Sequence, residues 1–211
     1  MDLFPEHSTK PVEIAAGACW LPGFALSVMP TLWQSLQQHL AAHPAQQMMT
    51  PMGLMSVATS SMGHWGWLGS SQGYGYLAYD PVTGQPWPAI PPVILQLAAN
   101  AAAQAGYSDF VPDSCLINIY QAGSKMGLHQ DKDEQDFSQP IVSVSLGIPA
   151  TFLFGGAKRN DASAKIPLQH GDVVVWGGES RRFYHGVAAI GAHQHPLTGN
   201  KRINLTLRKA K

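Results

Sequence analysis

Apolar residues follow a helical period in two stretches of the first half of the chain. One apolar stripe recurs at every fourth position: Leu32, Leu36 and Leu40. This spacing predicts a helix with Ser27 as N-cap and Pro30 in its first turn, ending before Pro44. A second helix is predicted over about residues 91–105, with Gly106 as its stop signal. Its apolar side is formed by Ile94, Leu97 and Ala101. Both stripes indicate core packing.

From residue 114 onward the pattern changes to short strands bounded by Gly, Pro or Asp. The predicted strands cover residues 114–120, 141–146, 151–154, 173–176 and 203–208. In the first of these, alternation places Leu116, Asn118 and Tyr120 on one face and Cys115, Ile117 and Ile119 on the other. Several short strands separated by turns favour a β-rich (α+β) fold with a sandwich or jelly-roll core.

Residues 45–80 have no long apolar period and are rich in Gly, Ser and aromatic residues. Glycines between aromatics indicate short strands and mobile turns that carry large, flat side chains. Trp67, Tyr74 and Tyr76 are therefore candidates for exposure to a ligand, although core packing explains such residues equally well. A stiff, proline-rich connection follows, with Pro81, Pro86, Pro88, Pro91 and Pro92.

Composition limits the class of protein. A chain of 211 residues with 45% apolar and 12% charged residues suits one domain with its own core. No signal peptide or long apolar span is evident, and Cys19 and Cys115 lack the spacing of a zinc knuckle. We therefore expect a soluble, cytoplasmic protein.

His39 and His43 have no partnering carboxylate and are expected to be structural or surface residues.

The formal net charge is zero, but the charges are unevenly distributed. Residues 1–110 hold one basic and five acidic residues, whereas residues 111–211 hold twelve basic and eight acidic ones. If the protein binds a phosphate backbone, the second half supplies most of the positive charge. A solvated basic face explains the same distribution.

His129-Gln130-Asp131 is the first candidate for chemistry. Two residues apart on an extended segment, the imidazole and the carboxylate project to the same side. With His185 as a third ligand they would form the two-histidine, one-carboxylate face of a non-haem Fe(II) site, which leaves coordination positions open. A zinc hydrolase could use the same ligands.

Arg202 and Arg208 give the second clue, because they fall on one face of the strand Arg202-Ile203-Asn204-Leu205-Thr206-Leu207-Arg208. Two guanidiniums on one side of a strand-rich core are costly unless they meet anions. A small dicarboxylate would satisfy both through charge-assisted hydrogen bonds. Salt bridges to protein carboxylates, or an exposed edge strand, are the alternatives. Neither a non-enzymatic jelly-roll binding module nor a zinc hydrolase would explain the paired arginines.

Together, the H-x-D pattern, the later histidine and the R-x-N-x-T-x-R strand resemble the Fe(II)- and 2-oxoglutarate-dependent dioxygenases, and most closely the AlkB family of nucleic-acid dealkylation enzymes. The resemblance runs from Leu3-Phe4 to Arg208. It implies a double-stranded β-helix (jelly roll) core over residues 111–211, N-terminal helices and a nucleotide-recognition lid over residues 45–90, all in one catalytic domain of residues 1–211.

The resemblance also implies cofactors and their ligands. Fe(II) would be held by His129, Asp131 and His185, with 2-oxoglutarate and O2 as cosubstrates. The distal carboxylate of 2-oxoglutarate would meet Arg202, and Asn118, Tyr120, Asn204 and Arg208 would complete its site.

The implied reaction is the oxidative dealkylation of 1-methyladenine and 3-methylcytosine in single- or double-stranded DNA, with RNA left open. Hydroxylation of the alkyl carbon releases formaldehyde, succinate and CO2. The base, flipped out of the helix, would stack between Trp67 and His185. The other substrate contacts implied are Tyr74, Tyr76, Asp133 and Arg159. The turn before Gly73 lacks the basic residue that relatives can carry there. The alternative is a 2-oxoglutarate-dependent hydroxylase of RNA, protein or a small molecule. We expect a monomer with no membrane partner.

Overall fold

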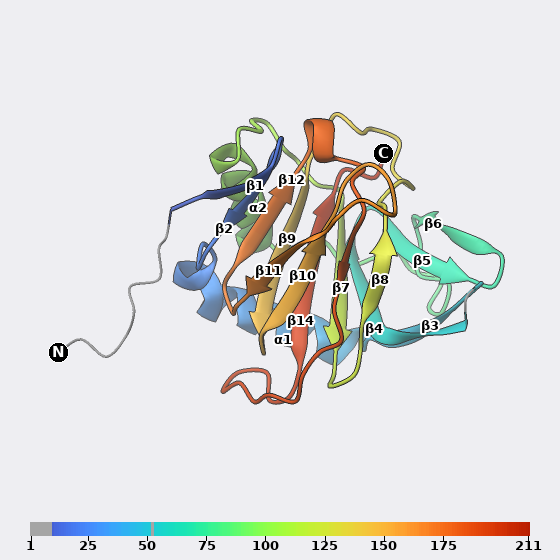
Figure 1. Cartoon of the computed structure of the whole chain (residues 1–211). Coiled ribbons are helices and arrows are strands. Elements are labelled where there is room, and N and C mark those ends of the chain that lie inside the picture. Colours follow the sequence, from blue (N-terminus) through green and yellow to red (C-terminus); the bar gives the residue numbers. More distant parts are fainter. Residues whose placement is uncertain (1–9, 52) are drawn as a thin grey trace.

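Two facing β-sheets form the body of the protein, as the computed structural model shows (Figure 1). It describes residues 10–51 and 53–211, so the resemblance at Leu3-Phe4 lies outside the described residues. The larger sheet has eight described strands, in the order β1 (Val12–Ala15), β2 (Ala18–Leu21), β12 (Val173–Trp176), β9 (Ile141–Gly147), β14 (Arg202–Arg208), β7 (Ser114–Tyr120), β4 (Gly53–Gly63) and β3 (Gln46–Thr50). The smaller sheet has the order β11 (Ala164–Leu168), β10 (Ala150–Phe154), β13 (His185–Val187) and β8 (Met126–His129).

The helices cover the outer face of the larger sheet, on the side away from the smaller one (Figure 1). The helix α1 (Met29–Ala42) follows the 3-10 turn η1 (Leu26–Val28), and α2 (Pro92–Gln104) ends before Gly106. Both predicted helices are thus confirmed. The N-cap prediction is wrong: Ser27 lies within η1, and the N-cap of α1 is Val28, which has no side-chain capping bond. A 3-10 turn before the helix occupies the position that a capping serine would need.

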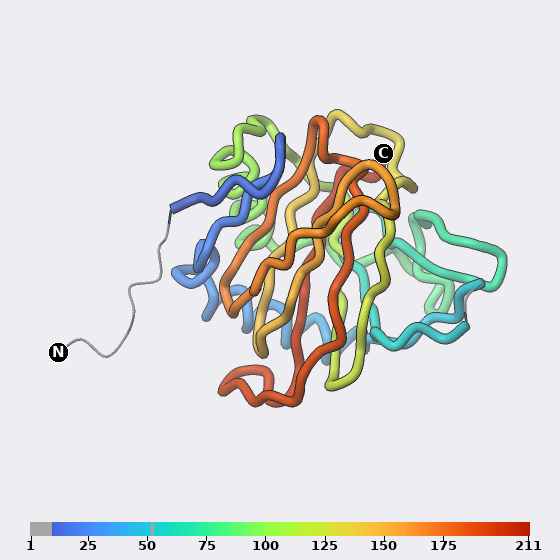
Figure 2. Tube along the Cα trace, viewed as in Figure 1, coloured from blue at the N-terminus to red at the C-terminus, as the bar shows by residue number. Residues whose placement is uncertain are grey.

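All five predicted strands are present, with boundaries that differ by at most one residue at either end. In the centre of the larger sheet, β14 lies between β9 and β7. It belongs to the red, C-terminal part of the tube in Figure 2 and is labelled in Figure 1. Antiparallel register pairs Arg202 with Tyr120 and Asn204 with Asn118. Residues directly opposite each other project to the same face, so the polar residues of both strands point between the sheets. Their apolar neighbours face the helices.

Residues 45–90 do not form one separate unit. The strands β3 and β4 pair with the larger sheet through β7, while β5 (Gly66–Ser70) and β6 (Gly73–Leu77) form a two-stranded hairpin beside it. The larger sheet therefore extends beyond the predicted range of residues 111–211, since β1 to β4 also belong to it. The long strand β4 escaped prediction because serines and glycines interrupt its apolar pattern.

Trp87 holds the base of this hairpin. Its indole Nε1–H donates to the backbone oxygen of Leu77 at 2.8 Å. A Cβ atom at Gly66, which pairs with Leu77, would lie 2.2 Å from the Trp87 ring. Only glycine admits so close an approach. The indole of Trp87 therefore contacts both ends of the hairpin, at Gly66 and at Leu77.

Both cysteines pack towards the helical side of the larger sheet. Cys115 is fully buried, and burial raises the pKa of its thiol to about 12. Cys19 is half-buried, and burial also raises the pKa of its thiol. Neither thiol therefore ionises at neutral pH. In the described part of the chain, the helices are too short or too polar to cross a membrane.

His39, on the buried side of α1, predicts a pH-dependent stability. Its Nε2 lies 2.9 Å from Ser60 Oγ, and burial, helped by the nearby His43, lowers the pKa of His39 from 6.5 to about 4. Protonation therefore favours the unfolded chain, and the stabilisation present above pH 6.5 is lost as the pH falls towards 4. We expect His39→Gln to flatten this part of the pH profile of the unfolding free energy, measured by urea denaturation. His64→Gln, at an exposed histidine, should keep the wild-type slope.

Candidate metal centre

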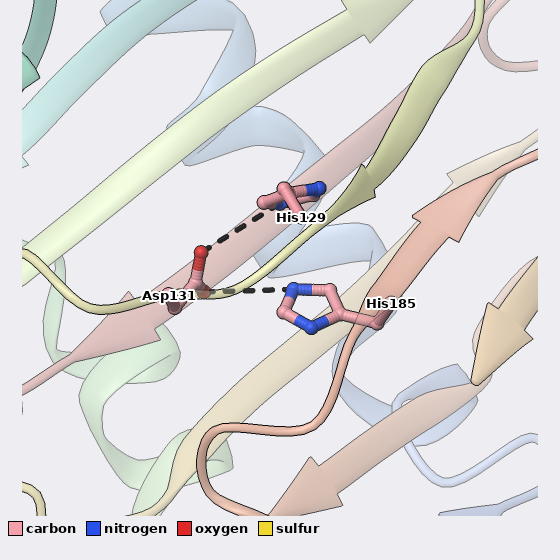
Figure 3. A group of neighbouring side chains, drawn as sticks. All are labelled: His129, Asp131 and His185. Atoms are coloured by element: carbon pink, nitrogen blue, oxygen red, sulfur yellow. Dashed lines mark ion pairs between the residues drawn. The ribbon is translucent and has the colours of Figure 1, made fainter. Parts of the chain in front are cut away.

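Three potential metal ligands meet at the inner edge of the smaller sheet (Figure 3). His129 ends β8, Asp131 follows in the next loop, and His185 begins β13 directly opposite His129. One ligand atom from each residue can be chosen so that all three lie within 4.8 Å of one another. The two Nε2 atoms lie 3.7 Å and 3.8 Å from the two carboxylate oxygens of Asp131. The structure thus brings the three predicted residues together.

The backbone orients both imidazoles toward Asp131. The Nδ1 of His129 lies 2.9 Å from the oxygen of Gly127, and that of His185 lies 3.0 Å from the oxygen of Phe183. A carbonyl only accepts hydrogen bonds, so each Nδ1 carries the proton and each Nε2 keeps its lone pair. Burial, followed by the nearby His129, lowers the pKa of His185 to about 4, which keeps this ring neutral. Such carbonyl contacts are typical of metal-bound histidines.

The carboxylate of Asp131 is ionised. Burial alone would raise its pKa, but Arg208 and, more weakly, the two histidines lower it well below the usual range. Arg208 donates to Asp131 Oδ2 from Nε at 2.9 Å and from Nη2 at 2.7 Å. For Arg208, the salt-bridge alternative therefore holds in this structure. A carboxylate beside two imidazoles is a donor set that fits Fe(II).

Arg202 differs, because it has no carboxylate partner among the described residues. Its guanidinium is 2% exposed and donates from Nη2 to Ser145 Oγ at 3.1 Å. The Tyr120 ring centroid lies 4.9 Å from its Cζ. In the described part of the structure, Nε and Nη1 have no hydrogen-bond partner. A buried cation with two unpaired nitrogen donors is costly unless an anion reaches it, and a carboxylate accepts charge-assisted hydrogen bonds from a guanidinium.

The amides beside Arg202 line the same polar face. Asn204 donates from Nδ2 to Ser143 Oγ at 2.8 Å and to the Val144 oxygen at 3.1 Å. Asn118 donates to Asn204 Oδ1 at 3.3 Å, whereas its own buried Oδ1 has no partner among the described residues. The face therefore combines fixed polar groups with unpaired ones, as expected of a site for a polar cosubstrate such as 2-oxoglutarate.

The β5–β6 hairpin brings aromatic side chains beside the metal centre. The rings of Trp67 and Tyr74 are stacked, with centroids 5.3 Å apart. The indole Nε1 of Trp67 donates to Asp133 Oδ2 at 2.9 Å. Tyr74 is exposed and Trp67 half-buried. The expectation of exposure is wrong for Tyr76, which is only 8% exposed because its hydroxyl donates to the buried carboxylate of Glu134 at 2.6 Å.

Two other residues complete the comparison with the sequence. Arg159 is exposed, and its Cζ lies 5.8 Å from the ring centroid of Tyr184, next to the ligand candidate His185. Glu134, which sequence reasoning missed, accepts from Arg181 Nη2 at 3.2 Å and lies 3.4 Å from Arg208 Nε. Glu134 lies in a run of charged residues, which is typical of a solvated surface, so no local pattern indicated that it is buried.

Known proteins share the fold and the whole length of this chain. The family model of the 2OG-Fe(II) oxygenase superfamily matches residues 17–208. The alpha-ketoglutarate-dependent dioxygenase AlkB of Escherichia coli (strain K12) is 51% identical over 211 residues, which cover 100% of this chain and 98% of that protein. The solved structure of OsALKBH1 matches with a TM-score of 0.77 and 30% identity, covering 93% of this chain and 100% of that one.

A shorter match links the chain to a human protein. The nucleic acid dioxygenase ALKBH1 of Homo sapiens is 35% identical over 94 residues, which cover 44% of this chain and 24% of that protein. The full-length similarities carry the assignment, and the donor set and the unpaired buried groups agree with it. The chain thus belongs to the 2OG-Fe(II) oxygenase superfamily and, within it, to the AlkB family of Fe(II)- and 2-oxoglutarate-dependent dioxygenases.

Proposed function

We propose that this protein removes alkyl groups from N-alkylated bases, such as 1-methyladenine and 3-methylcytosine, in DNA. The observation that carries this proposal is the stacked pair of Trp67 and Tyr74 beside the metal centre, with the Trp67 indole bonded to Asp133. Stacked aromatics next to an acid suit a flat, positively charged base. The relative ALKBH1 is named a nucleic acid dioxygenase, which supports a nucleic-acid substrate.

In this proposal, His129, Asp131 and His185 would hold Fe(II). When bound, the iron would supply, with 2-oxoglutarate and O2, the oxidant for hydroxylation of the substrate, and 2-oxoglutarate would end as succinate and CO2. For a methyl adduct, hydroxylation would turn a C–H bond into C–OH. The C–N bond would then break with loss of the hydroxyl proton, which releases formaldehyde and restores the base. The protein itself binds and orients the reactants and excludes competing reactions.

Arg202 would bind the distal carboxylate of 2-oxoglutarate through its guanidinium, in which Nε and Nη1 have no partner among the described residues. Asn118, Tyr120 and Asn204 would line the same site, and Arg208, which contacts Asp131, would lie at its metal end. This assignment is supported by the unpaired Nε and Nη1 donors of Arg202 and by the shared face of β7 and β14.

The base would lie between Trp67 and His185, and Asp133 would complement its positive charge. Tyr74 and Arg159, both exposed, would contact the nucleotide backbone. Tyr76, predicted to contact it as well, would instead support the hairpin from below, because its hydroxyl is engaged. We narrow the proposed recognition lid to the β5–β6 hairpin within a single catalytic domain. The cytoplasmic location and the monomeric state stay predictions.

Mass spectrometry of a single-stranded DNA oligonucleotide that contains 1-methyladenine or 3-methylcytosine tests the function. After incubation with the protein, Fe(II), ascorbate and 2-oxoglutarate, the methyl mass should be lost. Omission of 2-oxoglutarate should prevent the loss. A matched RNA oligonucleotide compares the two nucleic acids. If 2-oxoglutarate is bound but the methyl group persists in both, the proposed substrate is wrong.

Trp67→Ala is expected to weaken binding of the methylated oligonucleotide roughly 10- to 100-fold, because stacking contributes about 1 to 3 kcal/mol per base. Fluorescence anisotropy with a labelled oligonucleotide measures the dissociation constant. Tyr79→Ala, which removes an exposed aromatic just outside the hairpin, serves as the control and should bind like the wild type. Equal affinities of Trp67→Ala and the wild type would contradict the proposed stacking.

A further inference from the structure

Glu134 is a buried acid that three separate parts of the chain reach. Tyr76 donates to it from β6, Arg181 from the segment after η2 (Gly178–Ser180), and Arg208 approaches it from β14. Its side chain is 2% exposed. The two guanidiniums of Arg181 and Arg208 hold this buried carboxylate in place from both sides. Glu134 is therefore a fixed acceptor for the hydroxyl of Tyr76.

The hairpin is attached to the segment after Asp131 by two bonds at one rung. Trp67 and Tyr76 pair directly across β5 and β6, so both side chains project from the same face. Trp67 donates to Asp133, and Tyr76 donates to Glu134. The two acids differ in their surroundings, since Asp133 is exposed and Glu134 is buried. Water competes with the first bond but not with the second, so the second is the firmer attachment.

The hairpin needs such an attachment. A two-stranded hairpin is at best marginally stable by itself, and Tyr74 and Leu77 leave about half of their surface exposed. Trp87 fixes only the base, at Gly66 and Leu77. Nearer the turn, Gly69 N–H donates to Met48 Sδ of β3 at 3.0 Å. The rung that carries Trp67 is held by the bonds to Asp133 and Glu134. The buried bond therefore controls where the aromatic pair stands.

We propose that Glu134 is a positioning residue that anchors the β5–β6 hairpin through Tyr76 and so sets the place of Trp67 beside the metal centre. Glu134 and Asp131 share Arg208, so the anchor and the candidate metal ligand belong to one network of charged side chains. The anchoring itself is a property of the protein alone. Its consequence for the substrate rests on the proposed function.

Tyr76→Phe tests the anchor, because it removes one hydroxyl and leaves Glu134 and both arginines in place. In metal-free protein without oligonucleotide, hydrogen exchange of the amides of residues 66–77 should become about tenfold faster or more, as expected for a lost hydrogen bond to a charged group. Tyr79→Phe is the matched control and should exchange like the wild type. Unchanged exchange in Tyr76→Phe would overturn the proposal.

Kinetics then separate positioning from a general structural effect. With the methylated oligonucleotide, Tyr76→Phe should raise KM about tenfold while kcat changes less than twofold. The displaced aromatic pair weakens substrate binding, but the bound substrate brings the pair back into place before the reaction. A tenfold loss in kcat with an unchanged KM would count against the proposed anchor. Faster hairpin exchange in a protein that demethylates no oligonucleotide would refute the proposed function and leave the anchor standing.

Glu134→Gln provides a second variant. Its amide oxygen can still accept from Tyr76, but the charge that holds the two arginines is gone. Hairpin exchange should lie between those of the wild type and Tyr76→Phe. Exchange faster than in Tyr76→Phe would show that the arginine pairs, and not the tyrosine bond, hold the hairpin. If this variant does not fold, as judged by near-UV circular dichroism, Tyr76→Phe decides alone.

Discussion

Arg202→Met is expected to raise the dissociation constant for 2-oxoglutarate roughly a hundredfold, because truncating one partner of a buried charge pair costs about 2 to 5 kcal/mol. The guanidinium is buried, and its Nε and Nη1 find no partner among the described residues. The loss can be measured anaerobically from the absorption band that forms when 2-oxoglutarate binds the Fe(II) protein.

Arg202→Met should weaken cosubstrate binding without lowering the stability of the cosubstrate-free protein. Without an anion, Arg202 is a buried charge with incomplete compensation, so its removal relieves a cost while it sacrifices the bond to Ser145. The melting temperature of the cosubstrate-free variant should therefore equal or exceed that of the wild type, whereas stabilisation by added 2-oxoglutarate should vanish. Arg182→Met, at an exposed arginine, should retain that stabilisation. A variant at residue 202 that 2-oxoglutarate still stabilises fully would exclude Arg202 from the cosubstrate site.

Asp131→Asn should reduce turnover roughly a thousandfold or more, because it removes a candidate metal ligand. Even residues that only support the ligands of a metal site change metal affinity or activity by about 10- to 100-fold. Affinity for Co(II), followed by its visible absorption, should fall at least a hundredfold by the same reasoning. The free energy of unfolding of the metal-free protein should also drop by about 3 to 5 kcal/mol, the usual cost of breaking a buried ion pair.

Asp136→Asn is a suitable control for both measurements, because Asp136 lies in the same loop, accepts a hydrogen bond from the backbone N–H of Ser138 and is not one of the three candidate ligands. Wild-type Co(II) affinity in Asp131→Asn would mean that this carboxylate is not a ligand. Loss of stability alone, with the metal affinity intact, would assign Asp131 a purely structural role through Arg208.

Regular patterns explain which parts of the fold could be predicted. The leucine stripe of α1 and the alternation of β7 and β14 repeat over at least seven residues, so their faces could be read directly. The strands β8 and β13 are only four and three residues long, too short for a period to show. They are nevertheless the strands that carry His129 and His185.

The candidate site divides in a similar way. Side chains on one strand, such as Arg202 and Asn204, could be placed together because the period of a strand fixes their common face. Pairings between distant segments depend on tertiary packing, which no local pattern reveals. Thus Arg208 and Arg202 looked equivalent in the sequence, yet among the described residues only Arg208 of the two meets a carboxylate. For the same reason Glu134 was missed and Tyr76 was expected at the surface.

The protonated state of both cysteines has a practical consequence for spectroscopy. Maleimide dyes react with thiolates, and burial keeps Cys19 and Cys115 in the thiol form near neutral pH. A cysteine introduced at the exposed hairpin turn, for example at Ser71, would offer a far more reactive group than either native thiol. A single fluorophore could then be attached to the hairpin without first removing the native cysteines, and its motion could be followed in real time.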